Sequence, residues 1–183
     1  MGGLGLLAAL AGCCANSVCD CQDGRIDDLE LRFRVAADSL AGGTGFRRTD
    51  VDTVYVLRYA PRDSARARHD SVALVRLPSQ AAAPVLISNK APFGPAGGRK
   101  LNGYDYEVFV RLNRTGPGRR PSVHYRLSAI ELRDELTGDG CCSCFRNTNK
   151  RLTVINKKPG AAPVAYNLTD PADPRPGPVV LTR

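Results

Sequence analysis

The seven cysteines are the residues of this chain with the clearest potential for chemistry, and they fall into two clusters. Four stand near the start of the chain and three stand far downstream: Cys13, Cys14, Cys19 and Cys21, then Cys141, Cys142 and Cys144. Cysteines that are adjacent or one residue apart seldom reach disulfide geometry without strain. We therefore expect one or two disulfides that join the upstream cluster to the downstream one. In the chain-entropy account, a crosslink that closes a loop of about 120 residues stabilises the folded state by about 4 to 5 kcal/mol.

A four-thiolate metal site is the alternative use of the same sulfur atoms, with Cys19, Cys21, Cys142 and Cys144 as ligands, since thiolates bind zinc well. Structural zinc sites usually place two to four residues between the two cysteines of a pair. Here one residue separates the members of each pair. Disulfides are therefore favoured over metal, with free thiols as the third possibility, and we expect no metal and no other cofactor.

Catalytic motifs are scarce, and we expect no catalytic residues. The two histidines are His69, in an arginine-rich loop, and His124, at the start of a predicted strand, and no metal-ligand spacing connects them. The motifs Gly-x-Ser-x-Gly and His-Glu-x-x-His are both absent from the sequence. The glycine-rich stretch 94–100 lacks the glycine before the lysine and the Ser or Thr after it that a phosphate-binding loop uses. The acids at 23–30 lack the spacing of a calcium loop.

A hydrolytic site is the catalytic alternative, because carboxylates that are far apart in the sequence can meet in space. Asp105 and Glu107 stand two residues apart on a predicted strand, and His124 lies on another. If such groups gather on one face of the fold, we expect a concave pocket with at least two titratable groups within hydrogen-bond reach. Otherwise these acids are ordinary sheet surface.

Residues 1–12 form an uncharged and almost wholly apolar segment that ends in small residues directly before Cys13. The segment is too short for a membrane span, which needs about 20 apolar residues. Its length and composition are typical of the apolar core of a signal peptide. The four residues Leu10, Ala11, Gly12 and Cys13 resemble the lipobox of bacterial lipoproteins. A buried N-terminal helix with an ordinary cysteine is the alternative interpretation.

The resemblance implies that the thiol of Cys13 carries lipid and that acyl chains anchor the mature protein to a membrane. The expected location is the cell envelope, on the periplasmic or outer-surface side, where disulfides persist. Six cysteines then remain as disulfide candidates: Cys14, Cys19, Cys21, Cys141, Cys142 and Cys144. Matching three upstream partners to three downstream ones leaves six connectivities in place of the fifteen open to any six cysteines.

The chain carries 26 Lys and Arg against 18 Asp and Glu, a net charge of +8 at pH 7. An excess of this kind can mark a nucleic-acid partner. The basic residues, however, alternate with acids along the same segments, as Glu30 and Arg32 do, and the denser basic stretches have few aromatic residues beside them to stack bases. We therefore expect no nucleic acid, and a protein or glycan as the ligand of any binding surface.

From residue 29 onward, alternation of apolar and polar residues predicts short strands with one buried face. A change of the apolar phase between Leu127 and Ile130 predicts a β-bulge. The sequence shows no amphipathic helix of three turns. Short strands separated by turn residues are typical of antiparallel sandwiches and barrels. We expect an all-β fold, an antiparallel β-sandwich of immunoglobulin-like or transthyretin-like character, with strands near 29–35, 51–59, 71–77, 84–88, 104–112, 123–132, 151–155, 164–168 and 179–182.

The expected organisation is a lipoprotein signal peptide at 1–12, a cysteine-containing linker at 13–25, a β-sandwich domain at 26–158 and a proline-rich tail at 159–183. Prolines confine any strand in the tail to a sheet edge, and the tail is expected to be loosely attached. The expected function is that of a non-catalytic, envelope-anchored lipoprotein that serves as a binding or structural module. The alternatives are an envelope hydrolase with an acid and histidine site on one sandwich face, and a thiolate metal-binding protein.

Overall fold

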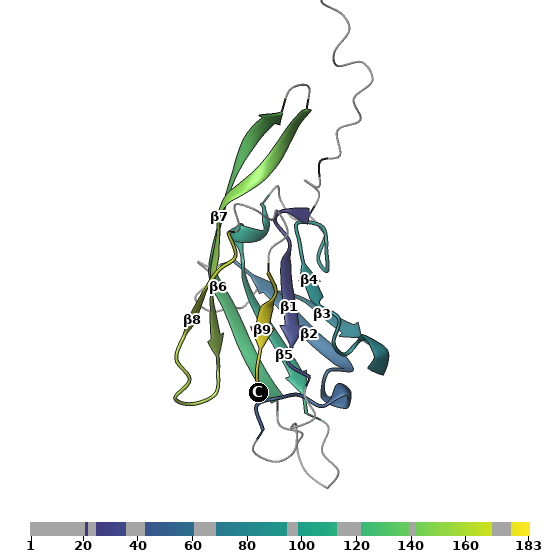
Figure 1. Cartoon of the computed structure of the whole chain (residues 1–183). Helices are drawn as coiled ribbons and strands as arrows, with labels where there is room; N and C mark the ends of the chain where they lie inside the picture. The colour runs from purple at the N-terminus through teal and green to yellow at the C-terminus, as the bar shows by residue number, and fades with distance from the viewer. Residues whose placement is uncertain are drawn as a thin grey trace, which may run out of the picture.

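The computed structural model describes residues 21, 25–35, 43–60, 69–94, 99–112, 122–139, 142–169 and 177–183. Within these residues the chain forms strands and short 3-10 turns and contains no α-helix. No helix in this part of the chain is long and apolar enough to cross a membrane. The strands assemble into two sheets that enclose one apolar core (Figure 1). The prediction of an all-β sandwich is confirmed.

The smaller sheet has the spatial order β4 (Val85–Ile87), β1 (Leu29–Phe33), β9 (Val179–Leu181). The larger sheet has the order β3 (Asp70–Val75), β2 (Thr53–Tyr59), β5 (Asp105–Arg111), β6 (Ser122–Asp139), β7 (Cys142–Asn156), β8 (Val164–Asn167). The 3-10 turns cover Arg48–Asp50, Pro78–Gln80 and Leu101–Gly103. Neighbouring strands pair antiparallel, with the exception of β1 and β9, which pair parallel.

The core lies where the alternating apolar side chains of the two sheets meet. On β1, Leu29, Leu31 and Phe33 are at most 1% exposed. The facing sheet contributes apolar side chains from four strands: Val54, Val56, Tyr106, Val108, Val110, Tyr125, Leu127, Leu152 and Val154. Because a shift of one residue would turn each of these side chains to solvent, the apolar pattern fixes the register of the larger sheet.

The predicted bulge in β6 is present. The pairing of β6 with β7 shifts register between Ser128 and Glu131, and Ala129 has a φ of 49°. The extra residue returns Ile130 to the core side of the sheet, where it is 8% exposed. The change of apolar phase in the sequence is therefore caused by the β-bulge in β6.

Replacing Ala129 by glycine is expected to raise the free energy of unfolding by about 0.5 to 1 kcal/mol. In the left-handed region the alanine Cβ crowds the following carbonyl oxygen, at a cost of roughly 1–2 kcal/mol. Glycine avoids this cost but loses part of the gain through its greater freedom in the unfolded chain. Denaturant unfolding measures the effect, and Ala165→Gly in β8 is the matched control, which should lose stability. A129G that unfolds as easily as A165G would contradict the argument.

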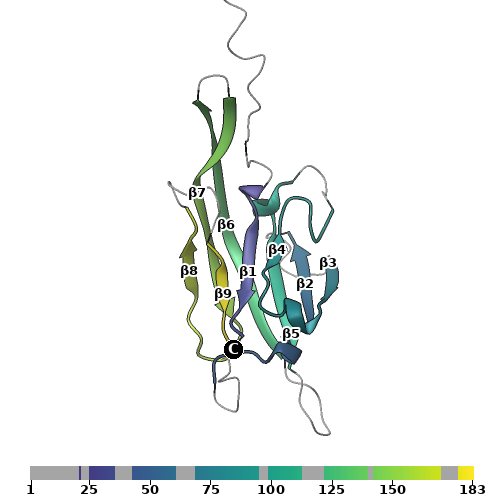
Figure 2. The same cartoon turned by 45° about the vertical axis from the view of Figure 1, so that its right-hand side comes forward.

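The β6–β7 hairpin is the longest feature of the fold. β6 has 18 residues and β7 has 15. We call residues 131–139 and 142–149 the arm. The arm projects past the other strands of both sheets at the end of the molecule opposite the C-terminus (Figure 1, Figure 2).

The C-terminal strands occupy sheet edges, as the prolines predicted, with β8 at the edge of the larger sheet and β9 at the edge of the smaller one. The expectation that this part of the chain is loosely attached is wrong for β9. Val179 and Leu181 are at most 1% exposed and belong to the core. The strand itself was predicted near 179–182, but its burial depends on pairing with β1, which is far away in the sequence.

Candidate functional site

A disulfide joins the two cysteine clusters, as the sequence predicted. Cys21 and Cys144 are bonded across 123 residues of chain, with their Cα atoms 5.4 Å apart. Cys142 is also disulfide-bonded. The other candidates, Cys14, Cys19 and Cys141, lie outside the described residues, as does the predicted lipid attachment site Cys13.

The four-thiolate metal alternative is contradicted by these bonds. Cys21, Cys142 and Cys144 are oxidised, so three of the four proposed ligands have no thiolate to offer a metal. Within the described ranges, no group of three or more His, Cys, Asp or Glu side chains is arranged to hold a metal ion.

The outer face of the larger sheet carries a ladder of stacked rings on three adjacent strands. Tyr55 of β2, Phe109 of β5 and His124 of β6 are direct cross-strand partners. The centroid of the Phe109 ring lies 4.7 Å from that of Tyr55 and 4.8 Å from that of His124, and the planes are within 10° of parallel. The guanidinium carbon of Arg111 lies 5.1 Å from the Tyr55 centroid. Stacking of this kind fixes the orientation of each ring.

His124 also stands at the centre of a hydrogen-bonded chain. Its Nε2 atom lies 2.6 Å from the hydroxyl of Ser122, and its Nδ1 atom lies 3.0 Å from Oε1 of Glu107. Oε2 of Glu107 accepts a bond of 2.6 Å from the ammonium group of Lys157. Since an ionised carboxylate only accepts hydrogen bonds, Nδ1 of His124 is a protonated nitrogen that donates to Glu107. When the ring is neutral, its Nε2 atom can accept a hydrogen bond from the Ser122 hydroxyl.

The surroundings of Glu107 favour its ionised form. Burial by itself would raise the pKa of this carboxyl, but the hydrogen bonds and charges of Lys157 and His124 outweigh burial, and the pKa is lowered below 4.5. The carboxylate is therefore charged at neutral pH and can hold the His124 ring in one orientation.

Glu107→Gln is expected to lower the free energy of unfolding at pH 7 by about 1 kcal/mol, since both bonding partners are partly exposed to solvent. A carboxyl whose pKa is lower in the folded chain contributes stability above pH 4.5, and that contribution is lost as the pH falls through the folded value. The variant should therefore lose less stability than the natural protein between pH 5 and pH 3. Denaturant unfolding across this range measures the difference, and the exposed Glu135→Gln is the control; equal slopes for all three proteins would contradict the prediction.

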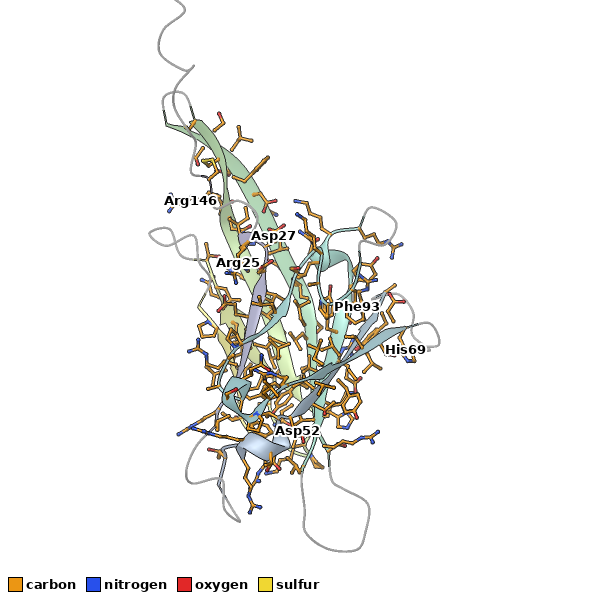
Figure 3. All side chains as sticks on the ribbon, turned by 90° about the vertical axis from the view of Figure 1, so that its right-hand side faces the viewer. Arg25, Asp27, Asp52, His69, Phe93 and Arg146 are labelled. Atoms are coloured by element: carbon orange, nitrogen blue, oxygen red, sulfur yellow. A yellow bond between two sulfur atoms is a disulfide. The ribbon has the colours of Figure 1, made fainter. Side chains whose placement is uncertain are left out.

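The structure brings together some of the titratable groups considered from the sequence and separates others. Glu107 and His124 meet, as the hydrolase alternative required. Asp105 pairs instead with the guanidinium of Arg126, at 2.7 Å. His69 is exposed next to β3, and two strands lie between β3 and β6 in the sheet. Figure 3 shows His69 at the side of the molecule, at the edge of the larger sheet.

A second polar cluster lies at the base of the arm. The side chain of Lys150 is 1% exposed, and its ammonium group donates to the backbone carbonyl oxygens of Ile26, at 2.7 Å, and Asp28. Asn147 donates to the Ile26 carbonyl as well, and Asn89 donates to Asp27 at 2.9 Å. Figure 3 shows Arg25 and Asp27 beneath the arm that carries Arg146. The cluster joins the beginning of β1 to β7.

Sequence patterns did not identify Ser122, Lys157, Lys150 or the two aromatic rings of the ladder as site residues. Ser122 and His124 stand two residues apart, which places them on one face of a strand, and this signal was present. Their meeting with Glu107 depends on which strands are neighbours and in what register, which no local pattern states.

Comparison of the chain with models of protein families, with curated proteins and with solved structures finds no match. The interpretation of the outer face, hereafter the ladder face (Tyr55, Glu107, Phe109, Arg111, Ser122, His124 and Lys157), therefore rests on its own geometry. It is a rigid sheet surface with ordered aromatic rings, a charged carboxylate, cations and an exposed hydroxyl.

Proposed function

We propose that this protein is an exported, lipid-anchored binding module whose ladder face contacts a protein or glycan ligand. The Cys21–Cys144 bond is the main support for the proposal that the protein is exported, because disulfides persist in oxidising compartments and are rare in the cytosol. The lipobox-like residues Leu10 to Cys13 support anchoring by acyl chains.

The composition of the ladder face supports binding. Tyr and Arg are enriched where proteins meet their partners, since they combine a large contact area with polar groups. Here Tyr55 and Arg111 lie against each other, and the Ser122 hydroxyl is exposed beside them. Because the rings are held by stacking and by the sheet, little conformational entropy is lost when a ligand orders them further.

The anchor is tested by the mass of the mature protein. We expect the N-terminal residue to be Cys13 with acyl chains attached, and a labelled fatty acid to enter the protein during growth. Cys13→Ser should abolish the label, and Cys14→Ser, one residue away, should retain it. An unmodified Cys13 in the mature protein, or a label that survives Cys13→Ser, would overturn anchoring.

The binding face is tested with arrays of immobilised oligosaccharides and extended peptides. Phe109→Ala should weaken any interaction by tenfold or more, a change of about 1.4 kcal/mol, because it removes the middle ring of the ladder. Leu77→Ala removes an apolar side chain that is 66% exposed just past the end of β3, outside the stacked rings, and serves as the control. Binding that Phe109→Ala and Leu77→Ala affect equally, or no binding to either array, would count against the proposal.

Hydrolysis of an ester is the second candidate function, and the chain from Ser122 through His124 to Glu107 is the observation that favours it. In this reaction the Ser122 oxygen would attack the acyl carbon while its proton passes to Nε2 of His124, and Glu107 would stabilise the imidazolium. His124 would then protonate the leaving alcohol, and water would release the acyl group from Ser122 by the reverse transfers.

A fluorophosphonate probe, which bonds covalently to activated serines, separates the two candidates. Labelling that is abolished by Ser122→Ala and retained by Ser128→Ala, on the same strand, would establish the hydrolase. Absence of labelling, or labelling that survives Ser122→Ala, would remove it and leave the binding module.

A further inference from the structure

Two large apolar side chains are exposed on the arm. Leu136 of β6 is 60% exposed, Phe145 of β7 is 49% exposed, and the two residues are direct cross-strand partners. Leu136 follows the buried Ile130 at even spacing along β6, so the pair continues the core side of the sheet past the bulge. Figure 2 shows that the arm extends beyond β1 of the smaller sheet at this end, and within the described residues at least about half of each of the two side chains is exposed.

The disulfide ties this part of the arm to the N-terminal side of the chain. Cys144 precedes Phe145 directly and is bonded to Cys21. Cys13 stands eight residues before Cys21, and eight residues span at most about 29 Å. Acyl chains on Cys13 would therefore be held within about 29 Å of Cys21, whose Cα atom lies 5.4 Å from that of Cys144 on the arm.

The ladder face lies toward the other end of the same hairpin. Leu136 stands twelve positions after His124 on β6, which corresponds to about 40 Å of strand. A molecule tethered through Cys21 at the arm would thus carry the ladder face on the side remote from its anchor.

We infer that Leu136 and Phe145 insert into the interfacial region of the lipid bilayer that holds the anchor, so that the arm supports the ladder face at a distance from the membrane. This inference rests on the proposed acylation of Cys13. Two apolar side chains suit a bilayer interface, where the acyl chains already supply most of the affinity. They do not suit a dimer, because a stable interface buries roughly 800 Å² on each partner.

Single tryptophans test the inference, since the natural chain contains none. Phe145→Trp places one on the arm, and Val75→Trp places one at a site that is 83% exposed on β3. Val75 pairs with Thr53 of β2. The next residue of β2, Val54, pairs with Val110 of β5, which in turn pairs with Val123 at the start of β6. Val75 is therefore level with the end of β6 that is remote from the arm. The full acylated protein is reconstituted into vesicles of phosphatidylcholine and phosphatidylglycerol whose acyl chains carry bromine, which quenches tryptophan on contact.

We expect Trp emission at position 145 to shift to shorter wavelength and to be quenched in the brominated vesicles, and emission at position 75 to stay unchanged. Emission at 145 that is neither shifted nor quenched, in protein that the mass shows to be acylated and that sediments with the vesicles, would overturn the inference and leave the anchor intact. Emission at 145 that shifts without vesicles, in a concentration-dependent way, would assign the pair to a second copy of the chain. A mature protein without acyl mass would overturn the proposed anchor itself, and the inference with it.

Discussion

Loss of the Cys21–Cys144 bond is expected to lower the free energy of unfolding by up to about 4 to 5 kcal/mol in the chain-entropy account, and by less if the disulfide of Cys142 constrains the same loop. The bond closes a loop of 123 residues, and most of its effect comes from the conformations that it removes from the unfolded chain. It also fixes Cys21 to the arm, next to the exposed carbonyl of Ser143. For a domain of this size, where total stability is commonly about 5–15 kcal/mol, such a loss approaches the whole stability of the fold.

The double variant Cys21→Ala, Cys144→Ala tests the bond without leaving a free thiol at either end. Guanidinium unfolding without reductant should show a lower midpoint for the variant than for the natural protein, and Ser143→Ala, between Cys142 and Cys144, is the control. In excess reductant the natural protein should lose stability as well, because all its disulfides open. A double variant as stable as the natural protein would contradict the expected loss, and would mean that the disulfide of Cys142 already constrains the loop or that the unfolded chain is already compact.

Replacement of Lys150 by methionine is expected to cost about 3 to 5 kcal/mol of unfolding free energy. The substitution keeps the length of the apolar stem but leaves the carbonyl oxygens of Ile26 and Asp28 without the ammonium donor that now reaches them. It also removes the positive charge that faces Asp27, Asp28, Glu30 and Asp134 at the base of the arm. The remaining acids would then lie in a poorly solvated cluster with less compensation.

The dependence of stability on pH separates the charge of Lys150 from its packing. Burial lowers the pKa of its ammonium group from 10.5 to about 8, and nearby acids oppose the shift only in part. Between pH 8 and 10.5 the unfolded chain therefore binds more protons than the folded one at this position, and the stability of the natural protein should rise with pH across that window. Lys150→Met lacks the group and should lack the rise.

Denaturant unfolding of both proteins at several pH values from 7 to 10 measures this difference. The exposed Lys158→Met is the matched control and should change stability by less than about 0.5 kcal/mol. If Lys150→Met does not fold, Lys150→Arg keeps the charge but cannot be deprotonated in this range, and it should abolish the rise in the same way. If the stability of either variant still rises with pH between pH 8 and 10, the rise is caused by another titratable group.

The arm is where sequence patterns and structure differ most. The sequence predicted strands at 123–132 and 151–155, whereas β6 continues to Asp139 and β7 begins at Cys142. Beyond the sandwich both faces of the hairpin are partly solvated, so the alternation that marks a strand is lost. The arm is held together by the pairing of β6 with β7. Because neither strand has a buried face there, the sequence shows no alternation of apolar and polar residues that would predict it.

The sequence by itself determined the elements that depend on local pattern: the all-β class, most of the short strands, the bulge near Ala129 and a disulfide between the two cysteine clusters. These follow from the two-residue period of a strand and from the geometry of a disulfide, which act over a few residues. Tertiary structure alone decided that β9 pairs parallel with β1, that Ser122, His124 and Glu107 meet, and that Lys150 is buried against the residues that precede β1. Each of these depends on which distant segments become neighbours and in what register. That choice is made by the packing of the whole core, which no single segment of the chain encodes.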